Sequence, residues 1–99
     1  MSDYIFEIID KSERKIRLTK KQWRHITKSH KYMANYLEKI KETLIKPQKI
    51  TISPYDKEVR YYYQYLKDLP DKNKYLLIAV RYLNEGGFVI TSYLVRNIK

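Results

Sequence analysis

The spacing of the apolar residues changes at Pro47, and this change constrains the fold more than any other feature of the sequence. Between residues 20 and 46 the apolar side chains recur every three or four positions, which is the spacing of one helix face. After Pro47 they alternate with polar residues or form continuous runs, as in β-strands. Because proline cannot continue a helix, it separates the two halves. The sequence therefore predicts an α+β fold, with N-terminal helices packed on a four-stranded antiparallel sheet.

The helical part has a start signal and an internal break. Thr19-Lys20-Lys21-Gln22 matches a capping box, in which Thr19 accepts from the Gln22 amide and Gln22 reaches back. A helix is expected from about Lys20, with a stripe of Trp23, Ile26, His30 and Met33. A second helical stretch has Met33, Leu37, Ile40 and Leu44 on one face. One long helix and a kinked pair are both compatible, and we favour a break near His30–Tyr32.

The second half contains four segments typical of strands, at residues 48–53, 58–66, 75–83 and 88–96. Segment 58–66 is rich in tyrosine, a good strand former. Segment 75–83 is continuously apolar and is expected to be the central strand. Residues 4–9 indicate a further short strand, which residues 15–18 extend or pair with.

The turn at residues 84–87 sets the register of the last hairpin. A two-residue loop would place Arg81 opposite Ile90. We favour a three-residue loop with Gly86 in the left-handed conformation, because it separates core from polar residues better. It pairs Arg81 with Val89, Ala79 with Thr91 and Leu77 with Tyr93. One face then has Ile78, Val80, Tyr82, Phe88, Ile90, Ser92 and Leu94, and the other has Arg81, Thr91 and Tyr93.

The charge of the chain is high and uneven. The 99 residues have a net charge of +10, and residues 11–31 contain nine Lys or Arg against one Glu. With 43% hydrophobic and 14% aromatic residues, the chain is not of the disordered class. Two interpretations of the basic stretch stay open, a phosphate-binding surface and a solvated helix face. The residues expected to contact an RNA backbone are Lys15, Arg17, Lys20, Lys21, Arg24 and Lys28.

Several classes of site are excluded by what the chain lacks. It has no Cys, which removes disulfides, thiol nucleophiles and Cys-based zinc sites and fits a reducing cytoplasm, the expected location. No apolar run reaches the roughly 18 residues of a membrane span, and the acidic N-terminus is not that of a secretory signal. His25 and His30 diverge by roughly 140° on a helix, so we expect no metal site. The length predicts a single domain over residues 1–99.

The candidate residues for chemistry and base binding are the two histidines and the pair of Arg60 and Tyr62. His25 projects among Lys and Arg, where its charged form is disfavoured, and this suits a general base. His30 lies on the apolar stripe, which also fits a structural histidine at the core edge. Arg60 and Tyr62 would present a guanidinium and a ring to unpaired bases. The alternative for the tyrosine run is packing at a half-exposed sheet surface.

Several short motifs follow one another along the chain in a fixed order. They are Trp23-Arg24-His25-Ile26 with His30, Tyr36, Ile40 to Pro47 with Thr43-Leu44, Tyr61-Tyr62, Leu76 to Val80, and Ile90-Thr91-Ser92-Tyr93. In this order they resemble the phage and mobile-element nuclease group of the barnase–EndoU–colicin–RelE superfamily, the BECR fold. The family often has a proline after the second histidine, where this chain has Lys31.

This resemblance implies a RelE-like fold and a metal-independent endoribonuclease of toxin or mobile-element type. It places a histidine of the first helix at the catalytic site, with Thr91 and Tyr93 of the last strand. Arg60 and Arg81 are added from the pattern of the sheet faces and not from the resemblance. The expected catalytic residues are His25, His30, Arg60, Arg81, Thr91 and Tyr93. No cofactor is expected, since the 2′-hydroxyl of RNA supplies the nucleophile. A non-catalytic basic module for RNA or DNA stays open, and an acidic antitoxin or immunity protein is a further expected partner.

Overall fold

The computed structural model describes residues 3–69, 72–84 and 86–98. The N-terminal elements are β1 (Tyr4–Ile9), β2 (Lys15–Thr19), α1 (Lys20–Ser29), the 3₁₀-helix η1 (Lys31–Asn35) and α2 (Leu37–Ile45). The remaining elements are β3 (Lys49–Ile52), β4 (Val59–Tyr65), β5 (Tyr75–Leu83) and β6 (Gly86–Val95). The break predicted near His30–Tyr32 is confirmed, because α1 ends there and η1 begins. Within the described ranges, no helix is both long and apolar enough to cross a membrane.

The sheet is larger than predicted. Its described part has six strands in the order β1-β2-β6-β5-β4-β3, and the β2–β6 pair is parallel while the other pairs are antiparallel. The prediction of a four-stranded antiparallel sheet with N-terminal helices is therefore wrong. The N-terminal hairpin joins the sheet because β2 pairs with the start of β6, where Lys15 lies opposite Gly86. A Cβ at Gly86 would lie 2.5 Å from the Lys15 carbonyl oxygen, so this close approach needs glycine.

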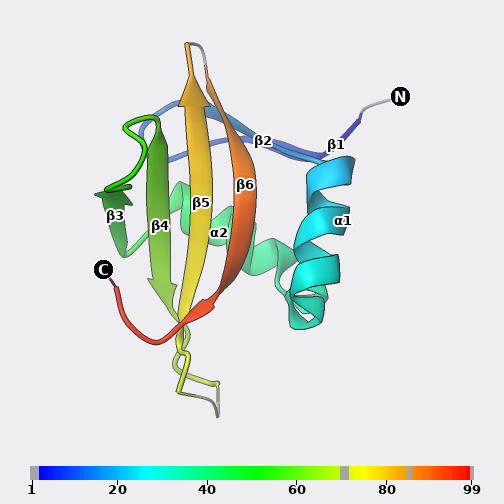
Figure 1. Ribbon diagram of the computed structural model, residues 1–99, viewed down its shortest axis with the longest axis vertical. Helices are drawn as coiled ribbons and strands as arrows, with labels where there is room; N and C mark the ends of the chain where they lie inside the picture. Colours follow the sequence, from blue (N-terminus) through cyan, green and yellow to red (C-terminus); the bar gives the residue numbers. More distant parts are fainter. Residues whose placement is uncertain (1–2, 70–71, 85, 99) are drawn as a thin grey trace.

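The helices cover one face of the sheet. In Figure 1, α2 lies behind the strands and α1 lies beside the β6 edge. The main core lies between α2, α1 and the sheet and includes Ile16, Leu18, Ile26, Leu44, Tyr62, Ile78 and Val80. The opposite side, which we call the helix-free face, has Val59, Tyr61, Tyr63, Leu77, Ala79, Arg81, Thr91 and Tyr93. The C-terminal segment packs Ile98 against this second face.

The last hairpin follows the predicted register only in part. Ala79 pairs with Thr91 and Leu77 with Tyr93, as predicted, but Arg81 pairs with Phe88 instead of Val89. The register shifts between these pairs because Ile90 forms a β-bulge. The bulge buries Val89 in the main core and turns Ile90 toward the helix-free face, which corrects the predicted faces of Phe88 and Ile90.

The predicted loop of this hairpin is also wrong. Gly86 is paired with Leu83 and has no positive φ, so the three-residue loop with a left-handed Gly86 does not form. Residue 85 of that loop lies outside the described residues. The shift toward the predicted register comes instead from the bulge further along β6.

Polar contacts hold α1 and η1 against the side of β6 beyond Phe88, where the pairing of β6 with β2 has ended. Thr19 caps the helix, with the Gln22 N–H donating to its hydroxyl at 3.0 Å, as predicted. The Gln22 side chain does not reach back to the cap, because its amide donates to the carbonyl of Ile90 at the bulge. Further along the edge, the Leu94 N–H donates to the Tyr32 hydroxyl at 3.2 Å. These bonds hold the histidine-bearing segment beside the final strand.

Candidate functional site

His30 and Tyr93 meet where the end of α1 reaches the helix-free face. His30 is the C-cap residue of α1, and its ring lies 5.2 Å from the Tyr93 ring, with an interplanar angle of 26°. The Tyr32 ring lies 5.8 Å from His30 on another side. Burial raises the pKa of Tyr93, and the neighbouring Tyr61, Tyr63 and Tyr32 add to the shift. We call His30, Tyr32, Tyr61, Tyr63 and Tyr93 the His30 cluster.

Thr91 lies next to this cluster on β6. It precedes Tyr93 by two positions and therefore points to the same face. Across the sheet it is in line with Ala79 and Tyr61, and Ala79 contributes only a methyl group between them. The His30 imidazole, the Tyr93 phenol and the Thr91 hydroxyl are thus partly exposed on one face of the sheet, whereas Tyr63 is buried. Such a set can move a proton and donate hydrogen bonds to phosphate oxygens.

His25 lies on the side of α1 next to the helix-free face. Trp23 packs toward the main core, while Gln22 contacts the β6 edge. At about 100° per residue, His25 follows Gln22 by roughly 60° around the helix, on the side away from Trp23. The His25 side chain is exposed, in contrast to the half-buried His30. The structure therefore brings only His30 into ring contact with Tyr93.

Arg81 is on the helix-free face but already has partners. Its guanidinium lies 2.8 Å from the Asp56 carboxylate and 3.6 Å from that of Glu58. The pKa of Asp56 is lowered, first by the hydrogen bond from the Glu58 N–H and also by Arg81. The Arg81 side chain is 42% exposed, so these are surface ion pairs, which solvent and salt weaken. A phosphate group can therefore compete for this arginine.

Arg60 and Tyr62 lie on the opposite side of the sheet. Tyr62 is fully buried, and its hydroxyl is bonded to the Asp10 carboxylate and to the Tyr82 hydroxyl. The structure thus offers no face of that ring to a base. Arg60 lies 5.8 Å from the Tyr82 ring, and its guanidinium donates to the Lys57 carbonyl at 2.6 Å. Neither residue adjoins His30, because side chains alternate along β4.

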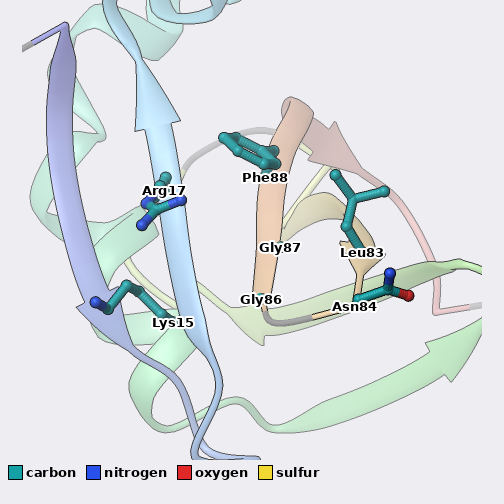
Figure 2. A pocket seen from close by; sticks show the side chains of 7 residues that line it. All are labelled: Lys15, Arg17, Leu83, Asn84, Gly86, Gly87 and Phe88. Atoms are coloured by element: carbon teal, nitrogen blue, oxygen red, sulfur yellow. The ribbon is translucent and has the colours of Figure 1, made fainter.

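The basic residues divide between β2 and α1. Lys15 and Arg17 both pair with Glu7, and the hydrogen bond from Arg17 lowers the pKa of Glu7. They line a groove of about 470 Å³ together with Phe88 (Figure 2). The other predicted RNA contacts are exposed and lie on the side of α1 away from its buried Ile26; they are Lys20, Lys21, Arg24 and Lys28.

Two features of the structure, the contact of Tyr32 with β6 and the buried Asp10, were not predicted from the sequence. Tyr32 follows His30 by two residues, but nothing in its local sequence indicates that its hydroxyl reaches β6. Asp10 is 4% exposed and accepts hydrogen bonds from the Tyr82 hydroxyl, the Ser12 side chain and the Arg14 N–H. Burial, with a contribution from Asp10, raises the pKa of Tyr82 to about 12. In the described part of the chain, no group of three or more His, Cys, Asp or Glu could hold a metal ion.

Comparison with protein families shows which family the chain belongs to. The family model described as phage-Barnase-EndoU-ColicinE5/D-RelE like nuclease2 matches residues 5–97. No curated protein and no solved structure matches the chain. The matched range includes α1, η1, β4 and β6, the elements that position the His30 cluster.

Proposed function

Because the chain belongs to the phage-Barnase-EndoU-ColicinE5/D-RelE like nuclease2 family, we propose that it is an endoribonuclease that cleaves RNA without a metal ion. The family supports a nuclease function in general. The observation that supports the finer proposal is the stack of His30 on Tyr93, with Thr91 beside it on the same face. In this proposal the helix-free face binds the scissile phosphate.

The chemistry is attack of a 2′-hydroxyl on the adjacent phosphorus. The bond from phosphorus to the 5′-oxygen breaks, and the product has a 2′,3′-cyclic phosphate. The protein must move a proton from the 2′-hydroxyl to the leaving oxygen and stabilise the charge on the phosphate oxygens. His30 transfers the proton, while the hydroxyls of Tyr93 and Thr91 donate to the phosphate. The raised pKa of Tyr93 keeps its phenol protonated, and hence a donor, at neutral pH.

Positive side chains border this face on two sides. Arg81 stabilises the developing negative charge by exchanging Asp56 and Glu58 for the phosphate. Lys15 and Arg17 of β2 lie at the end of the sheet near Phe88. The outer surface of α1 adds further cations for the phosphate backbone. Arg60 has no role in this proposal, because it lies on the other side of the sheet.

A toxin-type or mobile-element role and an acidic inhibitor protein as partner belong to the same proposal. The net charge of +10 supports such a partner, since an acidic protein would neutralise the RNA-binding surface. The second candidate function is a non-catalytic nucleic-acid module. It is favoured by the cations on the outer surface of α1, which can bind phosphates without any contribution from His30.

The decisive experiment is an assay of purified protein on a defined oligoribonucleotide in excess chelator. We expect cleavage with 2′,3′-cyclic phosphate ends, and none of the same sequence as 2′-O-methyl RNA. The matched pair of variants is Tyr93→Phe and Tyr55→Phe, since the Tyr55 side chain is 93% exposed. Loss of cleavage in chelator, or cleavage of the 2′-O-methyl strand, would contradict the proposed chemistry. Binding without cleavage by the wild type would favour the second candidate.

A further inference from the structure

We propose that the groove between β2 and the start of β6 binds one unpaired nucleobase of the RNA, beside the cleaved bond. This inference rests on the proposed function, because it assigns a substrate subsite of the same face. The groove has a volume of about 470 Å³, which is within the usual range of about 300–1,000 Å³ for small-molecule sites. It is therefore large enough for a base with its ribose.

The groove lies over the short parallel contact between β2 and β6, and two glycines are among the residues that line it. The β2–β6 pairing consists of three residue pairs, from Lys15 with Gly86 to Arg17 with Phe88. Figure 2 shows Gly86 and Gly87 between Lys15 and Arg17 on one side and Leu83 and Asn84 on the other. Because Gly86 has no side chain, its backbone forms an open floor at this point.

Phe88 provides the surface on which a base can stack. It is only half-buried, and it is not a member of either core cluster. The Arg17 guanidinium lies 5.9 Å from the centre of its ring and 5.3 Å from that of Tyr4. Unpaired bases stack both on aromatic rings and on guanidinium planes. The Asn84 amide at the rim can donate to and accept from the edge of a base.

The charge of the groove favours a nucleotide over an uncharged ligand. Among the described residues, Lys15 and Arg17 pair with one carboxylate, that of Glu7, so these three side chains together leave one positive charge for a phosphate. Arg81 pairs with Phe88 across the hairpin, but its guanidinium lies against Asp56 and Glu58, so it becomes available to a phosphate only by exchanging those carboxylates. A ring, a guanidinium and an excess of positive charge together are what a single-stranded nucleic acid binds.

The position of the groove links it to the catalytic face. Phe88 and Arg17 lie opposite one another, and Phe88 and Arg81 are paired, so all three project to the side of Thr91. Phe88 precedes Thr91 by three residues, roughly 10 Å along a strand. A base on Phe88 would therefore belong to a nucleotide next to the one at Thr91 and Tyr93. The groove would give the enzyme a base preference at one position beside the cleavage site.

The test combines a variant with an altered substrate. We expect Phe88→Ala to lower kcat/KM roughly 10-fold on a short oligoribonucleotide. An abasic nucleotide at one position beside the cleaved bond should cost the wild type a similar factor. The two losses should not add, because the variant already lacks the stacking surface. Phe88→Trp should retain or increase the preference, whereas Phe88→Leu, which keeps the bulk, should behave as Phe88→Ala.

Binding measurements separate this inference from the proposed catalysis. The affinity of each variant for a 2′-O-methyl oligonucleotide, intact or abasic, is measured by fluorescence anisotropy, with Tyr55→Ala as the control aromatic substitution. If the wild type does not cleave RNA but Phe88→Ala still removes the dependence on the base, the subsite stands and the catalytic proposal fails. If RNA is cleaved and the two losses are simply additive, the subsite is wrong. The subsite would also be wrong if an acidic peptide bound the wild type as tightly as the oligonucleotide does and lost the same affinity in Phe88→Ala.

Discussion

The imidazole ring of His30 stacks on the phenol ring of Tyr93, 5.2 Å between centroids, and so joins the end of α1 to the last strand. Two polar contacts bracket this stack along the β6 edge, from Gln22 to the Ile90 carbonyl and from the Leu94 N–H to Tyr32. The helix is thereby fixed relative to the strand at both ends of the site. Such fixed geometry is what proton transfer to a bound substrate requires.

Replacing His30 separates catalysis from binding. We expect His30→Ala to lower RNA cleavage about 10²- to 10⁴-fold, the usual contribution of a general acid or base. Affinity for a 2′-O-methyl oligonucleotide should change little, since the phosphate-binding cations are elsewhere. His25→Ala is the matched control and should have a smaller effect on the rate, because His25 makes no ring contact with Tyr93. Equal losses in both variants would contradict the assignment to His30.

Removing the Tyr93 hydroxyl tests its role as a hydrogen-bond donor. Tyr93→Phe keeps the ring stacked on His30, so its melting temperature should stay close to that of the wild type. Cleavage should fall roughly 10- to 100-fold, because one hydrogen bond to a charged phosphate is removed. Because burial raises the pKa of Tyr93 above that of an ordinary tyrosine, ionisation of its hydroxyl should not lower the activity at neutral or mildly alkaline pH. A pH–rate profile of both proteins from pH 5 to 10 measures this.

The outer surface of α1 can be tested by removing its charge. The triple variant Lys21→Gln, Arg24→Gln and Lys28→Gln should bind RNA more weakly. Its dependence of log affinity on log salt should become shallower by about one for each phosphate that the variant no longer neutralises. The matched control changes three exposed lysines elsewhere to Gln: Lys46, Lys57 and Lys67. Equal effects in the two triple variants would indicate that only the total charge matters and that this surface is a solvated helix face.

Tyr82 should make folding stability sensitive to alkaline pH. Burial raises its folded pKa to about 12, so the native state keeps a proton that the unfolded chain loses above about pH 10. The contribution is therefore fully present below pH 10 and lost as the pH rises toward 12, by up to roughly 2 kcal/mol. Urea unfolding of wild type and Tyr82→Phe over pH 8 to 11 should give a steeper decline for the wild type. Parallel curves would show that Tyr82 does not titrate in this way.

Gly86 is expected to be indispensable for joining the N-terminal hairpin to the sheet. In Gly86→Ala the new Cβ would meet the Lys15 carbonyl oxygen, a backbone atom that cannot easily move away. We expect a decrease of about 1–3 kcal/mol in the free energy of unfolding, the usual cost of overpacking. Asn84→Ala, at an exposed neighbouring position, should change stability far less. Chemical denaturation of the two variants provides the comparison.

Local signals in the sequence were sufficient to locate the helices and strands, although α2 begins at Leu37 and not at Met33, and β6 begins at Gly86 and not at Phe88. The Thr19 cap, the break at His30–Tyr32 and the start of β5 at Tyr75 all depend on residues close in the chain. The Thr19 side chain satisfies the free N–H of a residue only three positions later, and a strand is favoured by its own residue types. The pairing of Ala79 with Thr91 and of Leu77 with Tyr93 was also predicted, although by a loop that does not form.

Contacts distant in sequence decided the sheet and the site. The parallel pairing of β2 with β6 depends on Gly86 approaching Lys15, and no local pattern encodes an approach between residues so far apart in the chain. β4 has tyrosines at both odd and even positions, so the sequence alone could not tell whether its odd-numbered or its even-numbered residues face the helices. The packing of α2 decided this by burying Tyr62 in the main core and leaving Tyr61 and Tyr63 with Tyr93 on the other face. The sequence thus determined which segments are helices and strands, whereas burial of apolar surface against distant segments decided which of their side chains meet.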